Sequence, residues 1–318
     1  MNDPNLPHNI DKYMPLENRN VVLGVSGSIA AYKAADIASK LVQLGAIVDV
    51  ILTENALKFV GSPTFEGITH RPVTTTLWES NSPLKIDHVA LASRADCVLV
   101  APATANTLAK LSLGLSDDAL GTTVLATNAP IILAPAMDGD MWVNPATQNN
   151  VSNLKKQGIV FCGPEFGRMA SGIISTGRLS DSSNIVGIVR KAIGLGGDFS
   201  GRKVVISAGG TRESIDPIRF LSNHSTGKMG YALAEAARDR GADVTLIKAS
   251  TTLEPPTGIS ILTAETVSEM RHVVLQECKN ADLLVMAAAI SDFKPKKISI
   301  DKIKKSGNNL NLQLIENE

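Results

Sequence analysis

Short runs of β-branched and apolar residues alternate with longer helical patterns along the chain, and this alternation restricts the fold more than any other feature of the sequence. The strands expected in the first half are 21–25, 47–52, 97–101, 131–134 and 159–162. The helices expected between them are 30–44, 107–113, 117–127 and 145–157. Such alternation is typical of parallel strands joined by right-handed crossovers. The sequence therefore predicts an α/β fold that begins with a doubly wound domain.

A glycine-rich stretch divides the pattern in two. Residues 194–201 contain four glycines, as a domain linker would, and the alternation restarts after them. The strands expected in the second half are 204–207, 243–248 and 283–287, with helices at 229–240 and 267–278. A length of 318 residues also suits two domains. We expect two Rossmann-like domains, with boundaries as follows: a mobile N-terminal arm at 1–19, a first domain at 20–193, the linker at 194–201 and a second domain at 202–318.

The composition excludes several classes of partner. Lys plus Arg and Asp plus Glu each total 31, so the formal charge is zero, which argues against electrostatic capture of nucleic acid or of an anionic membrane. Aromatic residues make up only 4%, which leaves few platforms for stacked bases. Three scattered cysteines and five histidines without metal spacing predict neither a disulfide framework nor a zinc site. We expect a cytoplasmic protein with small-molecule substrates.

Ser26-Gly27-Ser28-Ile29-Ala30 lies between the first expected strand and the first expected helix. Free backbone N–H groups and the positive end of a helix hold a phosphate at such a turn, and the two serine hydroxyls add donors. No Gly-Lys-Ser/Thr follows, and no third glycine falls in register for a dinucleotide. A mononucleotide phosphate fits the turn, while a plain strand-to-helix turn with a serine N-cap is the alternative.

Two further segments end neighbouring strands. Residues 101–107 follow one strand and 135–138 follow the next, and ligands of open α/β sheets gather at the carboxyl ends of strands. Small residues there let a flat ring lie against the backbone, and Thr104, Asn106 and Asn128 are potential hydrogen-bonding groups. The alternative is that these residues are small only to permit tight packing, with Met137 as core filler.

His88 opens an expected helix, and a histidine is the side chain best suited to accept a proton near neutral pH. The other interpretation of a lone histidine at this position is a capping or surface residue.

The first half resembles the family of FMN-dependent cysteine decarboxylases. The segments that carry this resemblance are 24–33, His88, 101–107 and 135–137. The second half resembles phosphopantothenate–cysteine ligases through 208–213, 216–217, 222–230 and 302–305, of which the run at 222–230 is highly specific. The order of the halves is similar to that of the bifunctional proteins of coenzyme A biosynthesis, and the resemblance covers residues 20–318.

The resemblance implies two consecutive reactions in coenzyme A biosynthesis. The ligase half would use CTP and Mg²⁺ to convert 4′-phosphopantothenate into an acyl-cytidylate, which cysteine attacks. The flavin half, with FMN, would decarboxylate the product to 4′-phosphopantetheine, since oxidation of the neighbouring thiol supplies an electron sink. The resemblance also implies a flavodoxin-like first domain and a homo-oligomer with FMN at a subunit boundary.

The resemblance assigns roles to particular residues. Those assigned to FMN are Ser26, Gly27, Ser28, Ile29, Thr53, Thr104, Asn106 and Met137. His88 would be the base of the decarboxylation. In the ligase half, Asn223 would stabilise the acyl intermediate, and Lys302 would meet the nucleotide phosphates. Ala288 and Asp292 would contact the nucleotide, and the residues that hold the metal are unknown.

The sequence departs from the family at two positions of the flavin half. Asp138 stands where the family most often has a substrate-binding asparagine, and an ionised carboxylate about 4 Å from a substrate carboxylate would cost on the order of 4 kcal/mol. We therefore expect Asp138 to be protonated or to point elsewhere. Ser171 stands at the flap position of a proton-donating cysteine, and a hydroxyl is a much weaker acid than a thiol.

These departures keep an alternative open, namely an FMN-binding regulatory or flavin-modifying protein without decarboxylase turnover. A further expectation concerns the end of the chain. Residues 310–315 are expected to form a strand at an uncovered sheet edge, and ligase relatives continue further. We therefore expect an incomplete ligase domain, in a chain that is a fragment or lacks CTP-dependent ligation.

Overall fold

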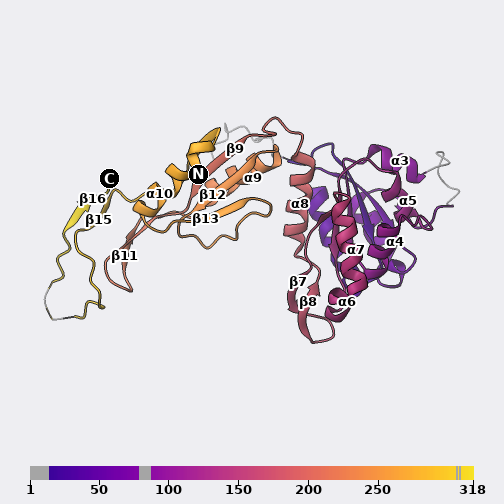
Figure 1. The fold of residues 1–318 in the computed structure, drawn as a ribbon, viewed down its shortest axis with the longest axis horizontal. Helices are drawn as coiled ribbons and strands as arrows, with labels where there is room; N and C mark the ends of the chain where they lie inside the picture. Colours follow the sequence, from indigo (N-terminus) through magenta and orange to yellow (C-terminus); the bar gives the residue numbers. More distant parts are fainter. Residues whose placement is uncertain (1–13, 79–86, 306, 308) are drawn as a thin grey trace, which may run out of the picture. The chain divides into compact units, whose positions relative to one another are not determined.

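The computed structural model describes residues 14–78, 87–305, 307 and 309–318. The chain separates into two compact units, Met1–Ile193 and Gly194–Glu318, and each is described by itself (Figure 1).

The first unit is built on a parallel sheet of six strands in the order β3-β2-β1-β4-β5-β6. The strands are β1 (Asn20–Val25), β2 (Ile47–Leu52), β3 (Val73–Thr74), β4 (Cys97–Ala103), β5 (Ile131–Pro135) and β6 (Val160–Phe161). Without the two-residue edge strand β3, this is the flavodoxin-like order. Successive strands are added on one side of β1 up to β3 and on the other side from β4 onward, so the winding of the sheet changes direction between β1 and β4. The predicted α/β class and the flavodoxin-like fold of the first domain are confirmed.

Helices connect these strands and cover both faces of the sheet (Figure 1). They are η1 (Ile29–Tyr32), α1 (Lys33–Gln43), η2 (Ala56–Lys58), α2 (Ser62–Thr69), α3 (Asp87–Arg94), α4 (Ala105–Leu113), α5 (Ala119–Ala126), α6 (Gly139–Val143), α7 (Pro145–Lys156) and α8 (Ser182–Gly194). An antiparallel hairpin precedes α8 and comprises β7 (Glu165–Arg168) and β8 (Ile174–Arg178).

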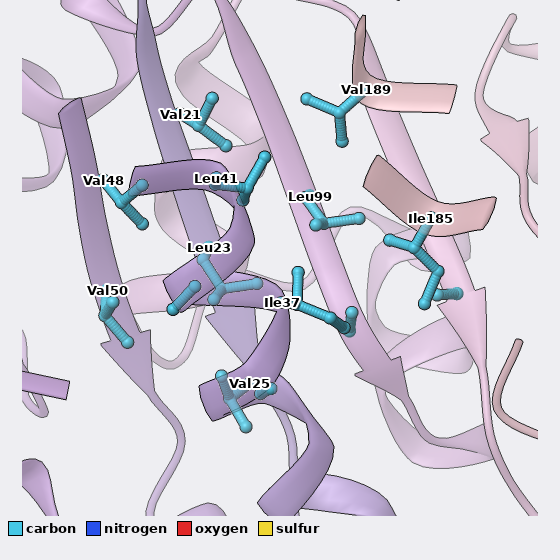
Figure 2. Packing of buried hydrophobic residues seen from close by; sticks show 14 of the residues in the cluster. Val21, Leu23, Val25, Ile37, Leu41, Val48, Val50, Leu99, Ile185 and Val189 are labelled. Atoms are coloured by element: carbon cyan, nitrogen blue, oxygen red, sulfur yellow. The ribbon is translucent and has the colours of Figure 1, made fainter. Parts of the chain in front are cut away.

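Alternation along β1 divides the core into two layers. Val21, Leu23 and Val25 pack with Ile37 of α1 and Ile185 of α8 on one face, as Figure 2 shows. On the other face, Val22 belongs to a cluster with residues of α4, α5 and α7, and Gly24 leaves room for Leu120, whose Cδ1 would lie 2.3 Å from a Cβ at that position. Burial on both faces explains why the strands read as nearly continuous apolar runs.

The described part of the expected N-terminal arm packs against the first unit. Leu16 is 1% exposed and belongs to the core, and its amide donates to the carbonyl of Leu44 at 3.0 Å. Arg19 forms an ion pair with Asp96 at 3.2 Å. The prediction of an arm over residues 1–19 is therefore wrong for 14–19, because one buried leucine anchors this segment, and residues 1–13 lie outside the described residues.

The second unit is a smaller doubly wound sheet in the parallel order β13-β12-β9-β14. Its strands and helices are β9 (Lys203–Ala208), α9 (Lys228–Asp239), β12 (Asp243–Lys248), β13 (Ser260–Thr263), α10 (Val267–Glu277), η3 (Cys278–Asn280) and β14 (Leu283–Met286). One core cluster contains residues of α9 and another contains residues of α10. The winding of this sheet changes direction between β9 and β14.

Two antiparallel hairpins extend from this sheet, β10 (Arg212–Ser214) with β11 (Phe220–Ser222), and β15 (Phe293–Pro295) with β16 (Leu314–Glu316). The segment expected to form a strand at 310–315 pairs only over Leu314–Glu316, and it pairs with β15 rather than with the main sheet. The expectation of an unaccompanied strand on the open sheet is therefore wrong.

Candidate functional site

The predicted segments 26–30 and 101–107 lie at the carboxyl ends of β1 and β4, where the winding of the sheet changes direction. β1 leads into Ser26-Gly27-Ser28, and the adjacent strand β4 leads into Thr104 and α4. Ser28 caps η1, because its Oγ accepts from the amide of Ala30 at 3.2 Å, and Thr104 caps α4 through the amide of Thr107 at 3.3 Å. Two helix N-termini thus open at the carboxyl edge of the sheet, where ligands of this fold class bind.

The hydroxyl of Ser26 joins these two segments. Ser26 is 2% exposed, its Oγ donates to the carbonyl of Pro102 at 2.7 Å and it accepts from the amide of Thr104 at 3.0 Å. A hydroxyl has a single proton, so Ser26 does not supply the phosphate donor that the sequence suggested. Ser28 differs, because its oxygen accepts a hydrogen bond within its own turn and its proton remains for a ligand.

Gly27 is required by a close approach of the backbone. A Cβ at Gly27 would lie 2.4 Å from Asn55 Cβ and 2.8 Å from the Asn55 carbonyl carbon. Asn55 follows β2 and is two residues after Thr53, whose amide donates to the carbonyl of Val25 at 3.1 Å. The ends of β1 and β2 are thereby packed into one wall.

A cavity of about 500 Å³ lies between these segments, and we call it the polar cavity. Its volume is within the range of small-molecule and cofactor sites. The residues that line it are Ser26, Gly27, Ser28, Thr53, Glu54, Asn55, Thr104, Ala105, Asn106, Thr107, Lys110, Asp117, Asp118, Ala136, Met137 and Met141. Seven of the eight residues assigned to FMN are among them, and the eighth, Ile29, lines the neighbouring cavity.

Lys110, Asp117 and Asp118 form a charged cluster in this wall that the sequence analysis missed. Lys110 Nζ lies 2.8 Å from Asp117 Oδ1 and 3.2 Å from Asp118 Oδ2. The hydrogen bond that Lys110 donates to Asp117 raises the pKa of Lys110, and the same bond lowers the pKa of Asp117. Asp118 also caps α5 by accepting from the amide of Gly121 at 2.7 Å. The signal was the short spacing between a helical lysine and an Asp-Asp pair.

A second cavity of about 550 Å³ adjoins the first, and we call it the flap cavity because residues of the β7–β8 hairpin line it. It shares Ser28, Ala136 and Met137 with the polar cavity. Its other lining residues are Ile29, Ala30, Tyr32, Lys33, Asp138, Arg168, Met169, Ala170, Ser171, Gly177, Arg178 and Leu179. The predicted residues Asp138 and Ser171 thus meet here.

Close contacts pin the hairpin to the loop that carries Met137. The amide of Met137 donates to the carbonyl of Gly177 at 3.0 Å, and a Cβ at Gly177 would lie 2.2 Å from the Met137 carbonyl oxygen. A Cβ at Gly139 would lie 2.3 Å from Ser175 Oγ. The hairpin therefore forms a fixed wall of the flap cavity at β8.

Asp138 points part of its carboxylate at its own helix. Its Oδ1 accepts from the amide of Asp140 at 3.1 Å, which caps α6. The cationic residues Lys33, Arg168 and Arg178 line the same cavity, and Arg178 pairs with Glu165 at 2.9 Å. Asp138 therefore caps α6 through one oxygen and also lines the flap cavity.

His88 is partly exposed at the first turn of α3 and is not among the described residues that line either cavity. The structure thus places the predicted base outside the two cavities of this chain.

Three of the four predicted ligase residues, Asn223, Ala288 and Asp292, lie near the end of β14, where the winding of the second sheet changes direction. Asn223 Nδ2 donates to the carbonyl of Ile290 at 2.9 Å, and Ala288 lies two residues after β14. Asp292 lines a separate cavity of about 450 Å³ with residues including Ser291 and Phe293. Asn223, Ala288 and Asp292 are therefore linked through one segment, 287–292.

Lys302 is exposed, and its segment is anchored by Asp216 and Arg219. Asp216 is buried and accepts hydrogen bonds from the amides of Ile218, Arg219 and Ile303, while the Arg219 guanidinium donates to it at 2.9 Å and 2.5 Å. Burial by itself would raise the pKa of Asp216, but these hydrogen bonds outweigh it and hold the pKa well below its usual range.

Among the described residues, no group of three or more His, Cys, Asp or Glu side chains is arranged to hold a metal ion. Within the same ranges, every helix is too short or too polar to cross a membrane.

Two family models together match most of the chain. The Flavoprotein family matches residues 10–194, and the C-terminal domain of the DNA/pantothenate metabolism flavoproteins matches residues 199–318. The coenzyme A biosynthesis bifunctional protein CoaBC of Bacillus subtilis is 44% identical over 302 residues, which is 94% of this chain and 74% of that protein. CoaBC of Mycobacterium tuberculosis is 42% identical over 90% of this chain and 69% of its own length.

A solved structure resembles the first unit. It is a cysteine-to-serine mutant of a PPC decarboxylase in complex with pantothenoylaminoethenethiol, 31% identical, with a TM-score of 0.50. The match covers 55% of this chain and 97% of that one. These relatives do not favour the alternative of a regulatory flavoprotein without turnover. The chain belongs to the CoaBC family of bifunctional proteins of coenzyme A biosynthesis, enzymes that combine a decarboxylase with a ligase.

Proposed function

We propose that the first unit binds FMN in the polar cavity and decarboxylates phosphopantothenoylcysteine in the flap cavity. The observation that carries this proposal is the contact between the two cavities at Ser28, Ala136 and Met137. A cofactor in one cavity and a substrate in the other would meet at these three residues. The relative that was solved with pantothenoylaminoethenethiol supports this class of substrate.

The polar cavity has the groups that FMN requires. The amides of Ala105 and Asn106 occupy the first positions of α4, where helix geometry supplies no partner, and they would hold the phosphate together with the Ser28 hydroxyl. Thr53 would add a hydroxyl proton, because its Oγ1 accepts from the amide of Ala56 at 3.2 Å. Met137 would pack against the ring, with Ile29 on the side of the flap cavity.

FMN, when bound, would accept the electrons of the cysteinyl thiol and return them later, so that loss of carbon dioxide has an electron sink. His88 would take the thiol proton. Because His88 does not line either cavity of a single chain, we propose that a second copy completes the site, in line with a homo-oligomer. Exposed apolar side chains on and beside the hairpin, Phe166 at 72%, Ile173 at 58% and Ile174 at 64%, would bury against that copy.

In the flap cavity, Ser171 would deliver the last proton and Asp138 would keep α6 in place rather than bind the substrate carboxylate. Lys33 and Arg168 would balance the negative charge of the substrate.

For the second unit we propose CTP-dependent ligation of 4′-phosphopantothenate with cysteine. Lys302 would meet the triphosphate with Mg²⁺, and Asn223 would stabilise the acyl intermediate. Ala288 would offer the nucleotide its methyl group and its carbonyl oxygen, since its amide already donates to Ser207 at 3.1 Å. Asp292 would contact the nucleotide from the same segment.

Two assays on the purified chain test the proposal. The first unit should release carbon dioxide from phosphopantothenoylcysteine after FMN is supplied. The second should release pyrophosphate from CTP only when phosphopantothenate is present. A chain that binds FMN but yields no carbon dioxide would contradict the decarboxylase assignment, and absence of pyrophosphate would contradict the ligase assignment alone.

A further inference from the structure

Two hydroxyls buried at the end of β9 hold the segment that follows β14. Ser207 and Thr211 are both 0% exposed. Ser207 Oγ accepts from the amides of Ala287 and Ala288, each at 3.1 Å. Thr211 Oγ1 accepts from the amide of Ser291 at 2.9 Å. From the sequence, Thr211 was noted only as part of the segment 208–213, and Ser207 was not singled out.

Backbone contacts complete this arrangement. The amide of Ala289 donates to the carbonyl of Gly209 at 2.8 Å, and the carbonyl of Ala289 accepts from the amide of Thr211 at 3.2 Å. Asn223 Nδ2 donates to the next carbonyl, that of Ile290. Segment 287–291 is therefore fixed at every residue by groups from β9 and its following loop, or by Asn223.

The direction of these bonds limits what the segment can bind. The amides of Ala287, Ala288, Ala289 and Ser291 all donate within the protein. Such a segment is unlike an anion-binding loop, whose amides point at the phosphate. Negative charge on a nucleotide must then be met by side chains, and this segment presents side chains and carbonyl oxygens.

We propose that Ser207 and Thr211 are positioning residues for nucleotide binding by the second unit. They do not touch the nucleotide, but they set the conformation of segment 287–291 and thereby the placement of Ala288 and Asp292. This inference rests on the proposed CTP-dependent function. A buried amide that loses its acceptor is costly, so the segment would shift to find another partner when either hydroxyl is removed.

The variants are Ser207→Ala and Thr211→Val, the second of which keeps the shape of threonine and removes the acceptor. Thr211→Ser retains the hydroxyl and should rescue. Thr266→Ala is the matched control, because Thr266 caps α10 through the amide of Glu269 at 3.2 Å, so its loss destabilises the same unit through a hydrogen bond in which segment 287–291 takes no part.

Two readouts on the full chain test the proposal. Hydrogen exchange at the amides of Ala287 and Ala288 should accelerate in Ser207→Ala, and that at Ser291 in Thr211→Val. The Kd for CTP with Mg²⁺ should rise about tenfold or more in both, and stay within about twofold of wild type in Thr211→Ser and Thr266→Ala.

Unchanged exchange at these amides, or accelerated exchange with an unchanged Kd, would overturn the positioning role while the proposed ligase function stands. A wild-type chain that does not bind CTP would instead overturn the proposed function together with this inference. An equal rise in Kd for Thr266→Ala would show that general destabilisation, rather than the segment, controls CTP binding and would also overturn it.

Discussion

Each unit has a buried serine at the carboxyl end of its first strand. Each serine hydroxyl forms hydrogen bonds with the segment after the neighbouring strand, at the position where the winding of the sheet changes direction. Ser26 bonds the backbone after β4, at Pro102 and Thr104, and Ser207 bonds the backbone after β14, at Ala287 and Ala288. The outcomes differ. In the first unit, helix amides at Ala105 and Asn106 remain free of intrahelical partners beside a cavity of about 500 Å³.

In the second unit, the corresponding segment uses its own amides within the protein. Under the proposed function, the same crosslink would support two modes of ligand binding. The first site would hold an anion with backbone groups that folding has already placed. The second would rely on exposed side chains such as Lys302.

The largest effect is expected from the tightest backbone contact of the first site. In Gly27→Val the new Cβ would meet Asn55 Cβ at 2.4 Å, and the strand ends would have to separate. We expect this variant to purify without flavin and to resist reconstitution, as measured by flavin absorbance and fluorescence quenching. Gly67→Ala is the control, since nothing lies within 4 Å of its Cβ, and it should retain flavin. A yellow Gly27→Val protein would contradict the proposed cavity.

A large effect is also expected at His88. His88→Asn should keep its flavin and lose decarboxylation by about 10² to 10⁴ in rate, the usual contribution of a positioned base. Carbon dioxide release at saturating substrate, with flavin content as the control, measures this. Turnover equal to that of the wild type would contradict the role of His88 as the base and leave it as a capping or surface residue.

The crosslinking serines should separate the two sites. Ser26→Ala leaves the Thr104 amide without its acceptor, while the Pro102 carbonyl keeps the backbone amide of residue 26 as a donor at 3.2 Å. The unpaired amide costs about 1–3 kcal/mol, so FMN binding should weaken while CTP binding stays unchanged. Ser207→Ala should do the reverse. Ser112→Ala serves as the control, because Ser112 Oγ is buried without a hydrogen-bond partner in the described residues. Loss of both ligands in either variant would show that the sites are not independent.

Acid should weaken the second site through Asp216. Its pKa is held below the ordinary value of about 3.9, so its stabilising contribution is complete above that value and is lost as the pH falls toward the folded-state pKa. Asp216→Asn should accelerate hydrogen exchange at Ile218 and Ile303 at neutral pH, and this difference from wild type should shrink below about pH 4. A difference that grows in acid would contradict the assignment.

The smallest effect is expected at Ser171. Ser171→Cys replaces a hydroxyl with a stronger acid in the flap cavity and should speed the protonation step by less than about tenfold. Stopped-flow measurement of product formation tests this. Equal rates in wild type and Ser171→Cys would mean that another group delivers the proton.

Local pattern predicted the regular core well. Strand β12 was expected at 243–248 and occurs at Asp243–Lys248, because its centre at 244–247 is rich in β-branched and apolar residues and a glycine turn precedes it. The β7–β8 hairpin was not assigned as strands, because its alternation is weak and Phe166 and Ile174 are exposed. Leu16 was missed because one leucine gives no periodicity.

The site was predictable in its residue types and less so in its bonding. The position of Gly27 and Thr104 after neighbouring strands followed from the order of strands in the sheet. The use of the Ser26 hydroxyl by Pro102, 76 residues away, did not, because such a bond depends on sheet pairing that has no local signal. The capping of α6 by Asp138 likewise became visible only in three dimensions, whereas the pairing of Lys110 with Asp117 had a sequence signal in the short spacing of the two residues.

The most direct test of the central claim, that a flavin in the first site takes and returns the electrons of the substrate, is an anaerobic single-turnover measurement. The FMN-loaded chain is mixed with phosphopantothenoylcysteine while flavin absorbance and carbon dioxide are followed together. The account predicts that the oxidised flavin signal falls, carbon dioxide appears, and the signal then recovers as 4′-phosphopantetheine forms. An oxidised flavin signal that stays constant while carbon dioxide is released, or a chain that releases none, would contradict it.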